Sequence, residues 1–294
     1  MLAMFQLQGI IDQALEEDLG SGDLSARILP PSLEGQAKLY AKETGVMAGI
    51  DLTAQVFGRL DSRITAEVLM HDGEKVIPGS LVMDLKGPLA GILSAERTAL
   101  NFLQHLSGIA TATREAVDQV EGLPVRITDT RKTLAGWRAL QKYAVRVGGG
   151  YNHRFGLYDA VMLKDNHLTA MGGLTTAVEL ARKQFGHMVK LEVECESIVQ
   201  VQEALDCSVE VIMLDNMATE LMRQAVSLIN HRAIVEASGG MKTGRLREVA
   251  ETGVDLISIG ALTHSVKALD FSLDVGEIKF TTRRRLESGE PYGT

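Results

Sequence analysis

The sequence predicts an α/β protein: an open, incomplete TIM-like α/β barrel preceded by a smaller N-terminal α/β sandwich. From residue 124 onward, short apolar, β-branched runs alternate with segments long enough to form a helix, which is typical of parallel βα units. Six such runs can be recognised, fewer than a regular eight-stranded barrel needs. Residues 35–90 differ, because their short Val-, Ile- and Leu-bearing runs are punctuated by Gly and Pro. A chain of 294 residues has room for both parts.

The composition argues against several classes of protein. A formal net charge of −8 disfavours a generally basic surface for nucleic acid. Two cysteines, Cys195 and Cys207, cannot build a disulfide framework and fit a reducing, cytoplasmic setting. No apolar run approaches the roughly 20 residues of a membrane-spanning helix, and the acidic first 20 residues are unlike a secretory signal. We therefore expect a cytoplasmic protein with neither nucleic acid nor membrane as partner.

The N-terminal part begins with a predicted amphipathic helix and a loop. The loop follows from Gly20, Gly22 and the Pro30–Pro31 pair. Strands are predicted within 35–50, 64–70 and 75–89, with a helix over 51–57. His71 and Asp72 precede a glycine and indicate a turn rather than a site. The first helix is expected to place five apolar residues on one face: Leu7, Ile10, Ile11, Ala14 and Leu15.

A helix predicted over residues 91–120 leads out of the first domain. Its apolar stripe is Leu93, Ala99, Leu100, Leu103 and Leu106, and Gly108 permits a break. We therefore place a sandwich domain at 1–107, joined by a returning strand near 270–280, and the barrel domain at 108–269. The polar tail at 281–294 is expected to be solvated or disordered.

The barrel domain is predicted to hold six strands and at least four helices. The strands are expected at 125–130, 160–163, 189–193, 209–214, 233–235 and 255–259. The helices are expected at 174–185, 197–205, 219–229 and 243–252.

Polar residues stand at the C-terminal end of each predicted strand. They are Arg131 and Lys132, Lys164, Glu194, Asp215, Glu236 with Ser238, and Gly260. In a parallel barrel these ends converge on the face where active sites lie. Glu192 alternates with Glu194, so we expect one of them to point into the barrel and the other outward, and we choose Glu194 as the residue nearer the mouth.

Residues 127–167 concentrate basic side chains in a stretch that otherwise has the pattern of buried structure. These are Arg131, Lys132, His153, Arg154 and Lys164. Any one of them can be an ordinary strand-end cation that reaches solvent. Together they favour a site for a small anion with carboxylates or phosphates, because buried charges are costly without a partner. The glycines of Ser238–Gly240 and Gly260–Ala261 suit backbone amides that hold phosphate, although turns also need glycine.

Several long motifs together resemble the quinolinate phosphoribosyltransferase family. They are EDLGSGDLS, ERTALNFLQHLSGIAT, TDTRKT, GGGYNHRFGLYDAVMLKDNH, LEVE, IMLDN, EASGG and ISIGALTHS, covering about residues 18–273. The resemblance implies a small α/β sandwich, an open α/β barrel, and a homodimer or higher oligomer. It also implies that Arg97 acts in the neighbouring subunit's site.

The implied reaction joins quinolinate to phosphoribosyl pyrophosphate with loss of CO2, as in NAD synthesis. Arg97, Thr130, Arg131, His153, Arg154 and Lys164 would bind substrate, mainly the two carboxylates of quinolinate. Lys132, Lys164 and the amides of Ser238, Gly239, Gly240, Gly260 and Ala261 would hold phosphates. Glu194 and Asp215 would bind Mg²⁺ or the ribose hydroxyls. Lys132, Lys164, Glu194 and Asp215 are the expected catalytic residues.

One departure from the family pattern and three competing functions accompany the resemblance. The family usually has Thr-x-Pro-Gly after the Arg-Lys pair, whereas this chain has Thr133-Leu134-Ala135-Gly136, which is expected to loosen the loop.

Lys164 at a strand end would also suit a Schiff-base lyase. A non-catalytic relative and a transferase acting on nicotinate are two further candidates, and the complete cationic set argues against both.

Overall fold

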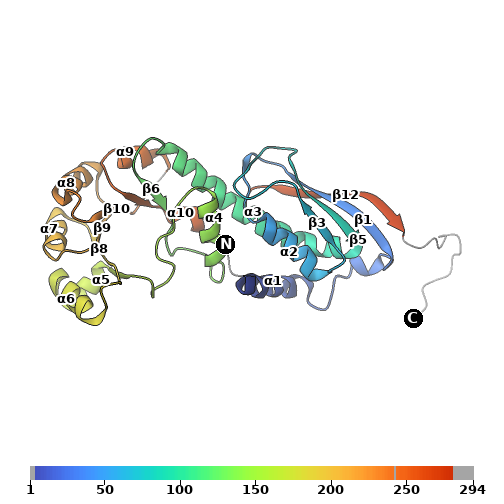
Figure 1. Cartoon of the computed structure of the whole chain (residues 1–294), viewed down its shortest axis with the longest axis horizontal. Coiled ribbons are helices and arrows are strands. Elements are labelled where there is room, and N and C mark those ends of the chain that lie inside the picture. Colours follow the sequence, from blue (N-terminus) through green and yellow to red (C-terminus); the bar gives the residue numbers. More distant parts are fainter. Residues whose placement is uncertain (1–3, 242, 281–294) are drawn as a thin grey trace. The chain divides into compact units, whose positions relative to one another are not determined.

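The computed structural model describes residues 4–241 and 243–280, so the predicted tail at 281–294 lies outside the described residues. The chain divides into two compact units (Figure 1). Met1–Ser107 and Ala268–Thr294 form the first, and Gly108–Lys267 forms the second. Each unit is an α/β structure with its own sheet.

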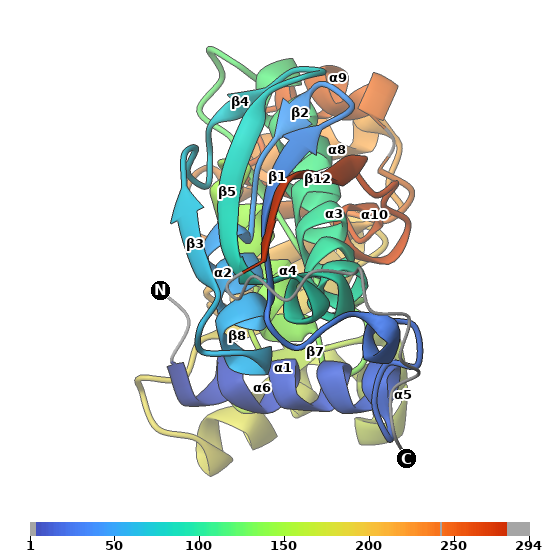
Figure 2. The same cartoon turned by 90° about the vertical axis from the view of Figure 1, so that its right-hand side faces the viewer.

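The first unit is built on a four-stranded antiparallel sheet. Its strands are β1 (Leu33–Ala41), β3 (Thr65–Val68), β5 (Leu81–Pro88) and β12 (Phe271–Phe280), in the order β12-β1-β5-β3. β12, drawn in red beside β1 in Figure 2, pairs with β1 from Leu33↔Phe280 to Ala41↔Phe271. Ala37, Leu39 and Ala41 alternate along β1 and are fully buried, so one face of the sheet forms the core. A two-stranded sheet, β2 (Gly45–Val46) with β4 (Lys75–Val76), accompanies it.

Two α-helices and a short 3-10 helix of the first unit precede β3 in the chain. α1 (Met4–Leu19) buries Leu7, Ile11 and Leu15 at a spacing of four residues, whereas Ile10 and Ala14 of the predicted face are partly exposed. A short 3-10 helix, η1 (Ala26–Ile28), follows in the predicted loop. α2 (Ile50–Leu60) is longer than the predicted helix over 51–57. The carboxylate of Asp72 accepts hydrogen bonds from the N–H groups of Gly49 and Ile50, so the predicted turn supports the start of α2.

The break that Gly108 would permit does not occur. α3 runs without interruption from Leu89 to Gln119. Leu106, Ile109 and Ala110 are fully buried on either side of the glycine. A glycine inside a helix costs only about 1 kcal/mol relative to alanine, which this packing outweighs. Leu93, predicted on the buried stripe, is 36% exposed.

The second unit contains a six-stranded parallel sheet in the order β6-β11-β10-β9-β8-β7. β6 and β7 form its edges, so the barrel is open as predicted. Fully buried residues on the central strands, including Val193, Ile212, Leu214 and Ala237, make its core. The strands are β6 (Arg126–Thr128), β7 (Val161–Leu163), β8 (Leu191–Cys195), β9 (Val211–Asp215), β10 (Ile234–Ser238) and β11 (Leu256–Ser258).

Helices follow the strands, as in βα units. α4 (Arg138–Val147), α5 (Asp165–Met171) and α10 (Ala261–His264) were not predicted. The predicted helices appear as α6 (Leu174–Gln184), α7 (Ile198–Asp206), α8 (Thr219–Ile229) and, after a 3-10 turn η2 (Thr243–Arg245), α9 (Leu246–Ala250). Among the described helices, none has the length and apolar character needed to cross a membrane.

Candidate active site

A cavity of about 500 Å³ opens at the C-terminal ends of the parallel strands in the second unit. β6 leads into Thr130, Arg131 and Lys132, and β7 ends immediately before Lys164. Asp215 ends β9 and Ser238 ends β10. The lining residues are Thr130, Arg131, Lys132, His153, Arg154, Met162, Lys164, Glu194, Met213, Asp215, Asn216, Glu236, Ser238, Gly239, Gly240 and Ser258.

Eleven of the fourteen predicted site residues line this cavity, and Arg97, Gly260 and Ala261 do not. Arg97 belongs to the first unit, where it is exposed on α3. Gly260 and Ala261 stand at the start of α10, just outside the lining. An added Cβ on Gly260 would lie 2.9 Å from Cδ of Lys132, so this glycine leaves room for the lysine side chain.

Two carboxylates and a lysine meet on one side of the cavity. Lys164 forms an ion pair with Glu194, and the amide of Asn216 donates a 2.7 Å hydrogen bond to Asp215. Burial and the neighbouring charge of Glu194 raise the pKa of Asp215. Two carboxylates that disfavour each other's charge are suited to sharing a divalent cation, and their oxygens are the ligands Mg²⁺ prefers. These residues therefore fit a Mg²⁺ site.

Two guanidinium groups lie on the cationic side. One nitrogen of Arg154 donates to the carbonyl of Ala160 at 2.9 Å, whereas Nε of Arg131 is buried and has no hydrogen-bond partner among the described residues. Burial and the charge of Arg131 lower the pKa of Arg154. An anion would relieve this repulsion and satisfy the buried donor of Arg131.

His153 lies on the floor of the cavity between two buried carboxylates. Its Nε2 is 3.3 Å from both Oε2 of Glu192 and Oε1 of Glu236. Burial alone would lower the pKa of His153, but its hydrogen bonds to Glu192 and Glu236 outweigh burial and raise that pKa to about 10. The three ligand atoms lie within 4.8 Å of one another, a spacing that suits a metal ion. In this structure the space between the two carboxylates is taken by Nε2 of His153, which contacts both of them.

The prediction that Glu192 and Glu194 point to opposite sides is wrong. Residues two apart on a strand share one face, because side chains alternate with a period of two. Both glutamates of β8 accordingly reach groups of the cavity: Glu192 contacts His153 and Glu194 contacts Lys164.

A buried ion pair that the sequence did not predict supports the floor. Lys142 of α4 is 1% exposed and pairs with Asp129, which is fully buried. Asp129 also accepts hydrogen bonds from the side chain of Asn152 (2.6 Å) and the backbone N–H of His153 (2.9 Å). Lys142 donates to the carbonyl of His153 at 3.0 Å. The pair therefore fixes the backbone that carries His153.

The Ser238–Gly240 turn requires glycine. Gly239 has φ of +81°, and an added Cβ would lie 2.3 Å from Oδ1 of Asn216. Gly240 has φ of +59°. Side chains are therefore disfavoured at Gly239 and Gly240, which leaves their backbone amides close to any ligand.

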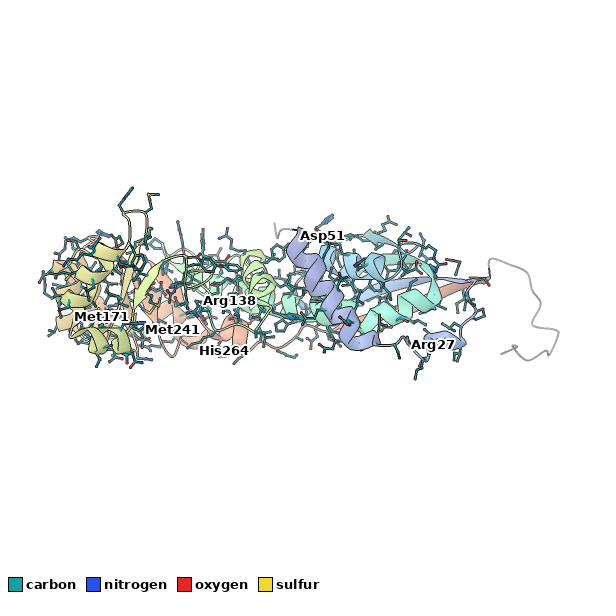
Figure 3. The ribbon with its side chains drawn as sticks, turned by 90° about the horizontal axis from the view of Figure 1, so that it is seen from below. Arg27, Asp51, Arg138, Met171, Met241 and His264 are labelled. Atoms are coloured by element: carbon teal, nitrogen blue, oxygen red, sulfur yellow. The ribbon has the colours of Figure 1, made fainter. Side chains whose placement is uncertain are left out.

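The loop that lacks the family's proline is held by side chains of α4. Gln141 accepts from the N–H of Leu134 (2.8 Å) and donates to the carbonyl of Thr263 (3.1 Å). Arg138, labelled in Figure 3, donates to Thr133 at 3.0 Å and to the carbonyl of Phe155 at 3.2 Å.

Other lining residues could only partly have been found from the sequence. Asn216 belongs to the IMLDN motif, and its φ of +53° is a conformation that asparagine tolerates. Ser258 ends β11, where strand-end reasoning would have placed it. Met162 and Met213 gave no signal, because apolar strand residues on either face look alike.

The fold and this cavity define an α/β protein with an open parallel barrel, whose strand ends line a cavity suited to small polyanions. Comparison with known families identifies the family within this class. Residues 23–107 match the model for the quinolinate phosphoribosyl transferase N-terminal domain, and residues 109–274 match the C-terminal domain. The chain belongs to the quinolinate phosphoribosyl transferase family.

Individual relatives agree with this assignment. The chain is 44% identical over 270 residues to a probable nicotinate-nucleotide pyrophosphorylase (carboxylating) of Bacillus subtilis, covering 92% of this chain and 93% of the relative. It is 41% identical to a mitochondrial quinolinate phosphoribosyltransferase (decarboxylating) of Nicotiana tabacum, covering 97% and 85%. The crystal structure of NadC from Streptococcus pyogenes superposes with a TM-score of 0.91 at 40% identity, covering 96% of this chain and 99% of the other.

Proposed function

We propose that this protein transfers the phosphoribosyl group of phosphoribosyl pyrophosphate to quinolinate with decarboxylation. The products are nicotinate mononucleotide, pyrophosphate and CO2, a step of NAD synthesis. One observation carries the proposal: a single cavity gathers five basic side chains and three carboxylates. The family and the names of its relatives supply the identity of the substrates.

Quinolinate would bind on the cationic side. Its two adjacent carboxylates would face Arg131, His153, Arg154 and Lys164, and a charged hydrogen bond contributes about 1.5–3 kcal/mol. Nε of Arg131, which has no hydrogen-bond partner in the part of the chain that the structure describes, is a donor ready for such a bond. A ring with two carboxylates uses this set better than the single carboxylate of nicotinate would.

Phosphoribosyl pyrophosphate would occupy the opposite side. Lys132, the amides of Ser238–Gly240 and the start of α10 at Gly260–Ala261 would hold its phosphates. Glu194 and Asp215 would hold Mg²⁺, which when bound neutralises charge on the leaving pyrophosphate. The same two carboxylates favour the positive charge that develops on the ribose as the pyrophosphate departs.

The chemistry requires no protein nucleophile. The pyridine nitrogen attacks the anomeric carbon, and the bond to pyrophosphate breaks with its electron pair on the leaving oxygen. The bond between the carboxylate and the ring carbon beside the nitrogen then breaks as CO2 leaves. Its electron pair stays on that carbon, stabilised by the adjacent pyridinium charge, and takes up a proton from solvent to give the mononucleotide. The protein contributes position and electrostatic stabilisation. A Schiff-base reaction fits less well, because the ion pair with Glu194 engages the amine of Lys164.

A homodimer in which Arg97 enters the neighbour's site is part of this proposal, and so is a cytoplasmic location. Arg97 is exposed on α3, as a residue acting on another subunit would need to be. The two cysteines are unpaired, which is in keeping with a reducing compartment.

The direct experiment is a product assay. The purified protein is incubated with phosphoribosyl pyrophosphate, Mg²⁺ and quinolinate labelled either in the ring or in the carboxylate beside the nitrogen. We expect labelled mononucleotide from the first and labelled CO2 from the second. Release of neither product would refute the proposal. If a parallel incubation with nicotinate in place of quinolinate alone gave mononucleotide, a non-decarboxylating transferase would be favoured.

Arg131→Ala tests the quinolinate subsite. We expect a higher KM for quinolinate and a kcat/KM lowered by about tenfold or more, because a charged hydrogen bond to a carboxylate is lost. Arg182→Ala is the matched control, since Arg182 pairs with Glu210 outside this cavity. An unchanged kcat/KM in Arg131→Ala would remove Arg131 from the site.

A further inference from the structure

Two buried polar side chains next to the Arg131–Lys132 segment have no place in the mechanism so far. Gln141 of α4 is fully buried, and Thr263 of α10 is 1% exposed. Neither of them lines the cavity. A buried amide or hydroxyl is costly unless it forms hydrogen bonds, so the partners of these two side chains indicate what they do.

Thr263 holds the backbone of Lys132. Its hydroxyl donates a 2.7 Å hydrogen bond to the carbonyl of Lys132. The carbonyl of Gly260 lies 3.2 Å from the same hydroxyl, but it already accepts from the backbone N–H groups of Thr263 and His264. A hydroxyl has a single hydrogen, and the shorter contact is the better hydrogen bond, so this hydrogen goes to Lys132. The bond therefore ties the segment after β6 to the helix after β11.

Gln141 holds both Thr263 and the loop beyond Lys132. Its side-chain amide donates to the carbonyl of Thr263 at 3.1 Å. Its side-chain oxygen accepts from the N–H of Leu134 at 2.8 Å. Gln141 and Thr263 thus form one hydrogen-bonded bridge from α4 through α10 to residues 132–134.

The bridge acts on Lys132 more directly than on Arg131. Arg131 is held within its own turn, because its carbonyl accepts from the N–H of Thr133 at 3.0 Å. The N–H of Lys132 likewise donates to Oγ1 of Thr130 at 3.0 Å. The carbonyl of Lys132, in contrast, is held from across the fold by Thr263. Loss of that hydroxyl should therefore displace Lys132 more than Arg131.

We propose that Thr263 is a positioning residue that, through the carbonyl of Lys132, fixes this lysine at the cavity, and that Gln141 holds the threonine in place. This inference rests on the proposed function, because it assigns Lys132 to the phosphates of phosphoribosyl pyrophosphate. A lysine side chain loses much conformational freedom when it binds an anion, and a backbone that is already fixed lowers this cost. Binding of phosphoribosyl pyrophosphate should thus depend on Thr263 more than binding of quinolinate does.

Thr263→Val tests the proposal, because it removes the hydroxyl and keeps the shape of the side chain. Steady-state rates are measured with each substrate varied while the other is saturating. We expect the KM for phosphoribosyl pyrophosphate to rise about fivefold or more and the KM for quinolinate to change less than about twofold. Thr263→Ala should behave in the same way. Thr263→Ser keeps the hydroxyl and should bring the KM for phosphoribosyl pyrophosphate back to within about twofold of the wild type.

Thr252→Val is the matched control for a structural effect. Thr252 is a buried threonine of the same unit, and its hydroxyl donates to the carbonyl of Val249 at 2.6 Å, away from the cavity. Its Tm, measured by calorimetry, should fall about as much as that of Thr263→Val, with both KM values unchanged.

The inference is refuted if the hydroxyl-free variants at position 263 leave the KM for phosphoribosyl pyrophosphate unchanged, or raise both KM values by the same factor. It is also refuted if Thr263→Ser does not restore that KM. In each of these cases the wild type still turns over quinolinate, so the proposed function stands. A wild type that forms no mononucleotide would refute the proposed function and this inference with it.

Discussion

The buried ion pair between Asp129 and Lys142 supports the backbone of this site. Burial raises the pKa of Asp129 and lowers the pKa of Lys142, and each shift is partly offset by the partner's charge. Asp129→Asn leaves the ammonium of Lys142 buried without a counter-charge. We expect a loss of about 3–5 kcal/mol in the free energy of unfolding, measured by urea denaturation.

The double variant Asp129→Asn/Lys142→Met is the matched comparison. It removes the unpaired charge and should recover a substantial part of the lost stability, because a buried ion pair stabilises little relative to apolar packing. If Asp129→Asn stays within about 1 kcal/mol of the wild type, the pair is not the support proposed.

The sequence identified the residues that line the cavity better than those that hold them. Arg131, Lys164 and Asp215 were accessible because they follow apolar strands, and parallel strand ends converge. Lys142 was not, since a lysine on an amphipathic helix is ordinarily solvated and only the folded chain brings it to Asp129. The prediction for Glu192 was wrong because it lies two residues from Glu194 on one strand, so both side chains share the face of the cavity.

Element boundaries were predicted less well than element order. The strands predicted at 189–193, 209–214 and 233–235 lie at Leu191–Cys195, Val211–Asp215 and Ile234–Ser238. They extend into polar residues because those residues face the cavity, so the end of an apolar run is not the end of a strand. α5 is only seven residues long and shows no apolar period; it begins where the ring of His167 accepts a hydrogen bond from the N–H of Lys164.

The Leu134–Trp137 turn offers a prediction at the same scale. The N–H of Trp137 donates to the carbonyl of Leu134 at 3.2 Å, and Gly136 has φ of +79°, which together fit a type II turn with Ala135 at its second position. Proline is favoured there. Ala135→Pro should therefore stabilise the protein by about 0.4–1 kcal/mol by restricting the unfolded chain, seen as a rise in Tm of about 1–3 °C by calorimetry.

Leu134→Pro is the contrasting variant. Its N–H donates to Gln141, so proline would remove a 2.8 Å hydrogen bond and should lower Tm. If Ala135→Pro lowered Tm as well, the turn would not have the geometry described, and the family's proline would not be interchangeable with this alanine.

At the scale of the whole molecule, the fold class and family followed from the repeating βα pattern and the long motifs. The assembly was expected from the resemblance alone, because a side chain that would act in another subunit leaves no pattern of its own in one chain. Arg97 is exposed on α3 and belongs to the first unit, whereas the cavity is built by the second. Whether the site takes Arg97 from its own chain or from a neighbour is therefore a question for complementation.

Two inactive variants, Arg97→Ala and Lys132→Ala, are expected to restore activity when mixed during refolding or coexpressed. In a mixed dimer, one site combines the intact Lys132 of one chain with the intact Arg97 of the other. With random pairing, half of the dimers are mixed and each has one complete site, so about a quarter of wild-type activity should return. Arg131→Ala mixed with Lys132→Ala is the control: both residues follow β6 of the same chain, so no mixed site is complete. Equal, negligible activity in the two mixtures would place Arg97 in its own chain's site, and full activity of Arg97→Ala alone would place it outside catalysis.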